Sequence, residues 1–134
     1  MKIAKKIYVI VCDDIRQEID DRISLIGVYQ EDLVVDAIPT IIPKFSFLVN
    51  LEETTINLPK IDIIIKPFKG ETKVLSFKAP PKNFSKGHNA RLIGQLSPFR
   101  VEAEGKVKIQ IRISESDKAK TIHTFDIINR SALD

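Results

Sequence analysis

The 134-residue chain has no tryptophan, one cysteine and two histidines. The single Cys12 excludes an intramolecular disulfide framework, and His88 with His123 cannot supply a multi-histidine metal cage. With aromatic residues at 7%, little material exists for base-stacking platforms or an aromatic ligand cage. No apolar run approaches the roughly 20 residues that cross a bilayer as a helix. We therefore expect a protein without cofactor, disulfide or membrane span.

The N-terminus resembles a signal peptide only superficially. A basic start precedes the apolar run Ile7–Cys12, but Asp13 follows at once, so the run is shorter than the roughly 7–15 residues of a signal core. Val11 is also a poor small residue for cleavage before Cys12. The sequence therefore predicts a cytoplasmic protein in which Cys12 is a buried strand thiol.

The composition favours strands over helices. The chain has 22 Ile and 9 Val against 9 Leu and 7 Ala. Because β-branched side chains have restricted χ1 freedom, they suit a pleated sheet better than a helix. We expect an all-β protein.

Alternating patterns mark several of these strands. The clearest are residues 45–51, 61–65 and 107–113, each with apolar side chains at every second position. Residues 7–18 and 23–29 form a hairpin candidate whose register is open: a two-residue turn pairs Ile19 with Arg22, whereas a three-residue loop pairs Ile19 with Ile23. We favour the second register because it brings apolar side chains together.

The remaining segments complete a regular series of short strands. Residues 91–96 and 99–103 suggest one interrupted strand, and 79–89 the longest loop. The last strand, 121–128, has no Pro or Lys, so it is either paired internally or an unprotected edge. Seven or eight strands at this spacing predict one domain over residues 1–134, a two-sheet antiparallel β-sandwich of Ig-like or C2-like type, with a small barrel as the alternative.

One stretch of the first third resembles a known family. Residues Cys12-Asp13-Asp14-Ile15-Arg16-Gln17-Glu18 are followed by Arg22-Ile23-Ser24-Leu25-Ile26-Gly27-Val28-Tyr29 and later by Pro39, Pro43 and Lys44. This pattern is similar to that of a family of bacterial and phage-associated proteins of unknown function. The resemblance implies a shared fold and no catalytic residues.

Acidic residues cluster in the same stretch, at positions 13, 14, 18, 20 and 21. A hard cation needs several carboxylates that converge from one loop, but alternation along a strand sends Asp13 and Asp14 to opposite faces. We therefore predict no metal site and a polar ladder at the end of the hairpin.

Two groups of charged residues are candidates for an interaction surface. Asp14, Arg16 and Glu18 share one face of their strand, where they can dock a charged partner or keep other chains from pairing. Between Glu71 and Glu102 the chain carries six basic and no acidic residues, which can contact phosphate or remain a solvated loop. The candidate surface comprises Asp14, Arg16, Glu18, Lys78, Lys82, Phe84, Lys86, His88 and Arg91.

No catalytic motif accompanies these residues. The chain lacks a nucleophile elbow, a zinc-binding HExxH motif, a P-loop and a dinucleotide fingerprint, so we expect no enzyme. The sequence predicts a protein-binding or structural module whose partner is another protein, or a second copy of the same chain. The alternative is a weak nucleic-acid or phosphate binder that uses the basic region 73–100.

Overall fold

The computed structural model describes residues 3–57, 60–78, 86–113 and 118–133, in which regular structure is almost entirely β-strand. No helix in these ranges is long and apolar enough to cross a membrane. The all-β prediction is confirmed. The elements are β1 (Ala4–Gln17), η1 (Ile19–Asp21), β2 (Ile23–Val28), β3 (Asp32–Val35), β4 (Thr40–Ile42), β5 (Phe45–Thr54), β6 (Lys60–Lys66), β7 (Lys73–Lys78), β8 (Ala90–Leu96), β9 (Phe99–Val101), β10 (Gly105–Arg112), β11 (Lys120–Asn129) and η2 (Arg130–Leu133).

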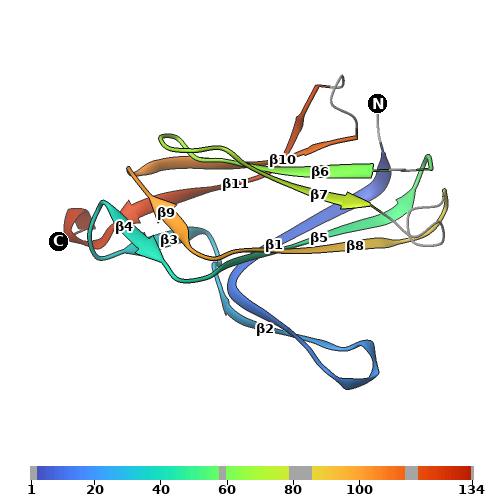
Figure 1. The fold of residues 1–134 in the computed structure, drawn as a ribbon, viewed down its shortest axis with the longest axis horizontal. Helices are drawn as coiled ribbons and strands as arrows, with labels where there is room; N and C mark the ends of the chain where they lie inside the picture. Colours follow the sequence, from blue (N-terminus) through green and yellow to red (C-terminus); the bar gives the residue numbers. More distant parts are fainter. Residues whose placement is uncertain (1–2, 58–59, 79–85, 114–117, 134) are drawn as a thin grey trace.

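Two larger sheets face each other (Figure 1). One has the strand order β2-β1-β5-β8 and the other β3-β11-β10-β6-β7, while β4 and β9 form a small third sheet at one end. The core lies between the larger sheets, because each central strand turns every second side chain inward.

The best-patterned strands supply this core, as predicted. Phe45, Phe47, Val49 and Leu51 of β5 are fully buried, and so are the alternating isoleucines of β6. Val107, Ile109 and Ile111 of β10 are buried as well, and they point into the core from the sheet that also contains β6. Burying each large apolar side chain contributes about 1.5–3 kcal/mol relative to leaving it in water, so this layer dominates the stabilisation.

Three details of the predicted topology are wrong. The sheets are not antiparallel throughout, because β3 pairs in parallel with β11, placing Leu33 beside Ile127. The described residues form eleven strands rather than seven or eight. The expected interrupted strand is two strands in different sheets, β8 and β9. The break falls at Ser97-Pro98, where proline has no N–H for a ladder.

The last strand is paired on both sides. β11 lies between β10 and β3, so the internally paired alternative is the one that the structure contains. Among the described residues, the strands of the two larger sheets with a neighbour on one side only are β2, β8, β3 and β7.

The first hairpin leaves the body of the protein as an arm. β1 pairs with β5 up to Cys12 and with β2 from Cys12 to Gln17, so the second half of β1 and β2 form a two-stranded ribbon. We call residues 13–28 the arm; it lies on the far side of β1, β5 and β8 from β6 and β10 (Figure 1).

The register at the tip of the arm differs from both alternatives considered. Gln17 pairs with Ile23, and the Glu18 N–H donates to the Arg22 carbonyl at 2.7 Å. The turn η1 between them leaves Ile19 79% exposed, so no apolar partner holds it. Asp20 and Asp21 take positive φ angles there, which acidic residues tolerate better than most.

The arm covers an apolar row on the outer face of its sheet. Ile10 pairs with Leu48, which pairs with Ile93, and alternation turns all three away from the core. Leu48 is nevertheless only 6% exposed. Ile15 and Leu25 face each other on one side of the arm and are half-buried. The arm lies on the side of the sheet that carries this apolar row (Figure 1).

Candidate binding cleft

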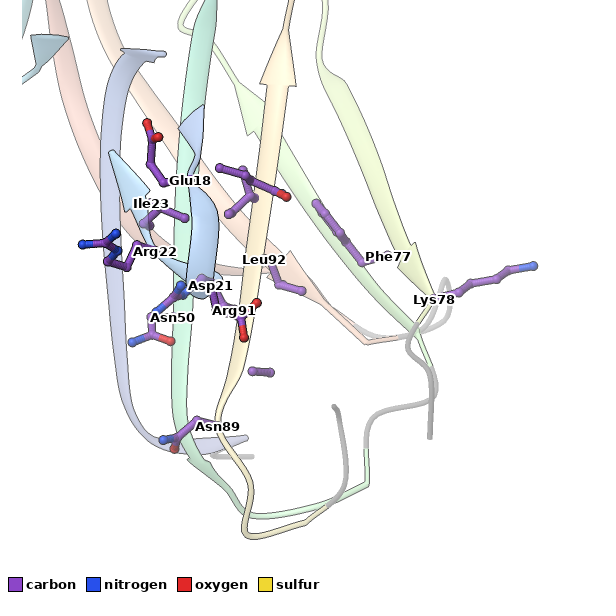
Figure 2. Close-up of a pocket in the computed structure, with 13 residues that line it drawn as sticks. Glu18, Asp21, Arg22, Ile23, Asn50, Phe77, Lys78, Asn89, Arg91 and Leu92 are labelled. Carbon is purple, nitrogen blue, oxygen red and sulfur yellow. The ribbon is translucent and has the colours of Figure 1, made fainter. Parts of the chain in front are cut away.

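The arm does not close against the sheet along its whole length. Near its tip a cleft of about 720 Å³ separates it from the outer face and the free edge of β8 (Figure 2). The lining comes from residues 17–23 of the arm, Asn50 of β5, the end of β7 and residues 89–93. The cleft thus joins segments from four parts of the chain.

The fold-back of the arm is held at its base. Asp13 accepts a hydrogen bond from the Tyr29 hydroxyl at 2.9 Å. Its carboxylate lies where a Cβ of residue 27 would project, and Gly27 has a φ of 66°. Only glycine satisfies both conditions, because it has no Cβ and takes positive φ at little cost. The Asp13 carbonyl accepts a further bond from Ser46 Oγ at 3.1 Å, which ties the base to β5.

Asp14 ties the same bend to the neighbouring strands. Its Oδ1 accepts hydrogen bonds from the Ile15 N–H at 3.0 Å and from Gln95 Nε2 at 3.4 Å. Its Oδ2 lies 3.8 Å from Arg16 Nε and 3.9 Å from Lys44 Nζ. Asp13 and Asp14 therefore have separate partners, in agreement with the polar-ladder interpretation of these carboxylates.

The strand that borders the cleft, β8, has one open edge. It pairs with β5 from Ala90 to Leu96, and no described strand pairs with its other side. About half of its backbone N–H and C=O groups therefore point outward along this edge. Figure 2 shows β8 between the arm on one side and Phe77 with Lys78 of β7 on the other.

The side chains around this edge differ on its two sides. Arg91 and Ile93 of β8 point to the outer face, toward the arm, whose tip contributes Asp21 and Arg22. On the inner side, Phe77 borders the cleft and makes an edge contact with Phe47, with ring centroids 6.5 Å apart. The outer side of the cleft is therefore charged and the inner side apolar.

The titratable groups near the arm do not form an activated nucleophile. Burial, followed by the charge of Asp13, raises the pKa of the Cys12 thiol, which favours the unreactive neutral form. Burial and the hydrogen bond to Asp13 likewise raise the pKa of Tyr29. On β11, burial lowers the pKa of His123, which is half-buried near Phe125. Each of these shifts favours the neutral form of its group.

The structure brings together some of the sequence-predicted residues and separates others. Glu18, from the charged strand face, and Lys78 and Arg91, from the basic interval, all line the cleft. Arg16 is exposed on the arm beside Asp14, and Lys86 and His88 are exposed before β8. Lys82 and Phe84 lie outside the described residues. Lys78 and Arg91 of the basic interval 73–100 therefore meet at one cleft, and its use as a phosphate-binding surface stays a prediction.

Sequence reasoning missed several cleft residues, above all Ile23, Asn50, Phe77 and Asn89. One signal was available for Asn50: it is the only strongly polar side chain within the run 45–51. Asn89 has a structural role as well, because its Oδ1 accepts a bond from the Glu53 N–H at 2.9 Å.

Metal ligands do not converge in the described ranges. No group of three or more His, Cys, Asp or Glu residues placed to hold an ion occurs within them. The acidic residues at the base of the arm are engaged by Tyr29, Gln95, Arg16 and Lys44. That the acidic group binds no metal stays a prediction.

Comparison with known proteins identifies a family and no activity. No curated protein and no solved structure matches the chain. A family model described as a family of unknown function, DUF6941, matches residues 7–123. The predicted membership of a family of unknown function is confirmed; the match does not test the motif or its bacterial and phage-associated origin. The chain belongs to the DUF6941 family.

Proposed function

We propose that this protein is a non-catalytic binding module that takes an extended segment of a partner protein onto the free edge of β8. The observation that carries the proposal is an edge of β8 that pairs with no described strand and that also borders the cleft. Main-chain hydrogen bonds along such an edge supply affinity, and pockets for alternate side chains supply specificity.

The cleft determines the chemistry of the segment. A strand added beside β8 alternates its side chains between the two faces of the sheet. Those on the inner side meet Phe77 and Leu92, whereas those on the outer side meet Arg91 and the charged tip of the arm. The expected ligand therefore alternates apolar residues with charged or polar ones.

The other edges are less suited to a partner strand. β3 has only four residues, Asp32–Val35. β7 begins and ends with a lysine, the residue that most often protects edges from pairing. β2 belongs to a two-stranded ribbon, which offers a weaker platform than a sheet. β8 has seven residues, without Pro or Lys, and has β5 and then β1 beside it in its sheet.

The same proposal includes the finer fold type and the location. We take the two facing sheets as an open β-sandwich of Ig-like or C2-like type rather than a closed barrel, since four strands remain edges among the described residues. We place the protein in the cytoplasm, because the free buried thiol of Cys12 suits a reducing compartment.

Peptide selection followed by hydrogen exchange tests the proposal. Selection from a displayed library of peptides of about eight residues, a common strand length, should enrich alternating apolar and charged sequences. Binding should slow amide exchange in residues 90–96, while β2 stays unchanged. Enrichment without alternation, or protection of β2 instead of β8, would contradict the proposal.

A pair of variants localises the interaction. Arg91→Glu changes the charge on the outer side of the cleft and should weaken the wild-type-selected peptides by about tenfold, the loss of one charged hydrogen bond. Arg100→Glu makes the same change on β9, outside this cleft, and should have no effect. Equal effects of the two variants would show that net charge, and not the cleft, determines binding.

Self-association is the form of this proposal in which the partner is a second copy. Light scattering at about 0.1 M and 1 M salt, where the Debye length falls from roughly 10 to 3 Å, separates edge pairing from charge-driven contacts. A dimer that persists at high salt and is dissolved by the selected peptide indicates that two β8 edges pair. A monomer under both conditions leaves a foreign protein as the partner.

A further inference from the structure

The outer face of the second sheet carries a dense group of cations. On β6, β7 and β10 the outward positions include six basic side chains and one acidic one, Asp62. The basic residues are Lys60, Lys66, Lys78, Lys106, Lys108 and Arg112. We call this surface the lysine face; its charge became visible only when the strand register was known.

Lysines lie directly opposite each other at both ends of this face. Lys66 pairs with Lys108 across β6 and β10, and Lys60 pairs with Lys78 across β6 and β7. Like charges in directly opposed positions destabilise a sheet. The arrangement is therefore unfavourable for the protein alone and becomes favourable when an anion lies between the ammonium groups.

The carboxylates near the face leave much of this charge uncompensated. Asp62 is buried, lies 3.1 Å from Arg112 Nη2 and 3.8 Å from Lys60 Nζ, and so compensates charge at that end of the face. Asp126 of β11 lies 3.8 Å from Lys106. Lys66 and Lys108 are exposed, and neither has a carboxylate partner in the described part of the chain.

The spacing of the cations suits an extended polyanion rather than a single phosphate. From Lys60 to Lys66 the strand advances six residues, or about 20 Å at roughly 3.3 Å per residue. The outward positions of β6, β7 and β10 contain no aromatic side chain, and the exposed Phe68 lies beside Gly105 at one end. The face therefore has no row of rings on which successive unpaired bases would stack. Lysine ammonium groups bind phosphates as point charges and do not read bases.

We propose that the lysine face binds the phosphate backbone of double-stranded nucleic acid without sequence preference. The argument rests on charge complementarity and on the opposed lysine pair, and it does not depend on the cleft at β8. It also differs from the use of the basic interval 73–100, because five of the six cations lie outside that interval.

Fluorescence anisotropy with a labelled DNA duplex of about 20 base pairs tests the proposal at salt concentrations between roughly 50 and 200 mM. Lys66→Gln with Lys108→Gln should weaken binding about tenfold at the lower salt. The slope of log affinity against log salt should decrease by about 1–2, the equivalent of the phosphate contacts removed. Changing the base sequence of the duplex should leave wild-type binding unchanged.

The matched control is Lys6→Gln with Lys86→Gln, which removes the same charge at exposed lysines away from the face. This variant should bind as the wild type does. Equal losses in both variants would show that net charge, and not the lysine face, determines binding, and a loss in the control alone would place binding at Lys6 or Lys86. Absence of wild-type binding at tens of micromolar, or binding of poly-glutamate in preference to the duplex, would also overturn the proposal.

The unfolding temperature of the variant should not fall when its affinity for the duplex falls, which provides a control for misfolding. Removing the opposed lysine pair relieves repulsion, so the unfolding temperature of the Lys66→Gln, Lys108→Gln variant should equal or exceed that of the wild type. Weaker binding by a variant that is at least as stable cannot come from misfolding.

Discussion

The two larger sheets turn opposite kinds of surface outward. The outer face of β1–β5–β8 carries the apolar row of Ile10, Leu48 and Ile93, and the arm lies over it. The outer face of β6–β7–β10 is mainly cationic, with Ile64 beside Val74 as its apolar pair, and no described segment lies over it as the arm does over the other sheet. The first face therefore depends on a covering element for its stability, whereas the second is compatible with water and with anions.

This difference shows that the arm has two functions. Ile15 and Leu25 make one side of the arm apolar, and the tip of the arm forms one wall of the cleft at β8. A variant that detaches the arm should therefore change both stability and peptide binding. A variant on the lysine face should change neither by much.

The largest expected effect comes from a charge placed beneath the arm. Leu48→Asp buries an unpaired carboxylate where Leu48 is 6% exposed and should cost about 3–5 kcal/mol in the free energy of unfolding. Val74→Asp makes the same chemical change on the lysine face, where Val74 is 50% exposed, and should cost less than about 1 kcal/mol. Urea unfolding of both variants measures the difference; equal costs would mean that the arm does not cover Leu48.

A smaller effect is expected at the base of the arm. Gly27→Ala adds a Cβ at a φ of 66° where the Asp13 carboxylate lies, so it should cost about 1–3 kcal/mol and speed amide exchange in residues 13–28. Gly87→Ala also has a positive φ, but its Cβ meets nothing within 4 Å. Its cost should be limited to the backbone strain, about 1 kcal/mol. If the two glycines behave alike, the contact with Asp13 does not position the arm.

The stability of the fold at low pH should depend more on Asp62 than on Asp126, the exposed carboxylate beside Lys106. The hydrogen bond from Ser76, and then Arg112 and Lys60, hold the pKa of Asp62 below its ordinary value of 3.8 despite burial. A depressed pKa stabilises the folded state above the unfolded pKa, and this contribution is lost as the pH falls through the folded pKa.

The test compares thermal unfolding of wild type and Asp62→Asn across this range. The variant should be less stable near pH 7, and the difference should shrink below about pH 3.8, where the wild type also loses its charge. Asp126→Asn, at an exposed pair with Lys106, should show a small difference at every pH. A difference that is constant with pH would rule out an ionised Asp62 as its source.

The smallest effect has the opposite sign. Lys66→Gln should increase stability by about 0.2–1 kcal/mol by removing its repulsion with Lys108, and the gain should disappear at about 1 M salt. Lys69→Gln, at an exposed position in the β6–β7 turn, should change nothing measurable. A loss of stability in Lys66→Gln would mean that the opposed lysines do not repel each other appreciably.

Much of the core was predictable because period-two alternation assigns a face to each residue without knowledge of the partner strand. Phe47, Ile63 and Ile109 were placed inside on this basis, and all three are fully buried. The same reasoning fails where both faces of a strand are covered. Alternation places Leu48 outward on β5 and Ile64 outward on β6, yet each is only 6% exposed.

The candidate sites were less predictable, since they combine residues distant in sequence. Glu18 and Arg91 were selected separately, and only the fold-back of the arm brings them to one cleft. The Asp20-Asp21 turn was recognised, but the pairing of Gln17 with Ile23 was not, because two registers of similar local quality were open.

The sequence by itself determined the all-β class, the inward faces of the central strands and the resemblance to a family of unknown function, because each depends on local composition, alternation or motif. The tertiary structure decided that β3 joins β11 in parallel, that the arm folds back at Gly27, and that Lys66 faces Lys108. These outcomes depend on which strands become neighbours. The choice of neighbours is determined by packing of the whole chain, and no short stretch of sequence contains that information.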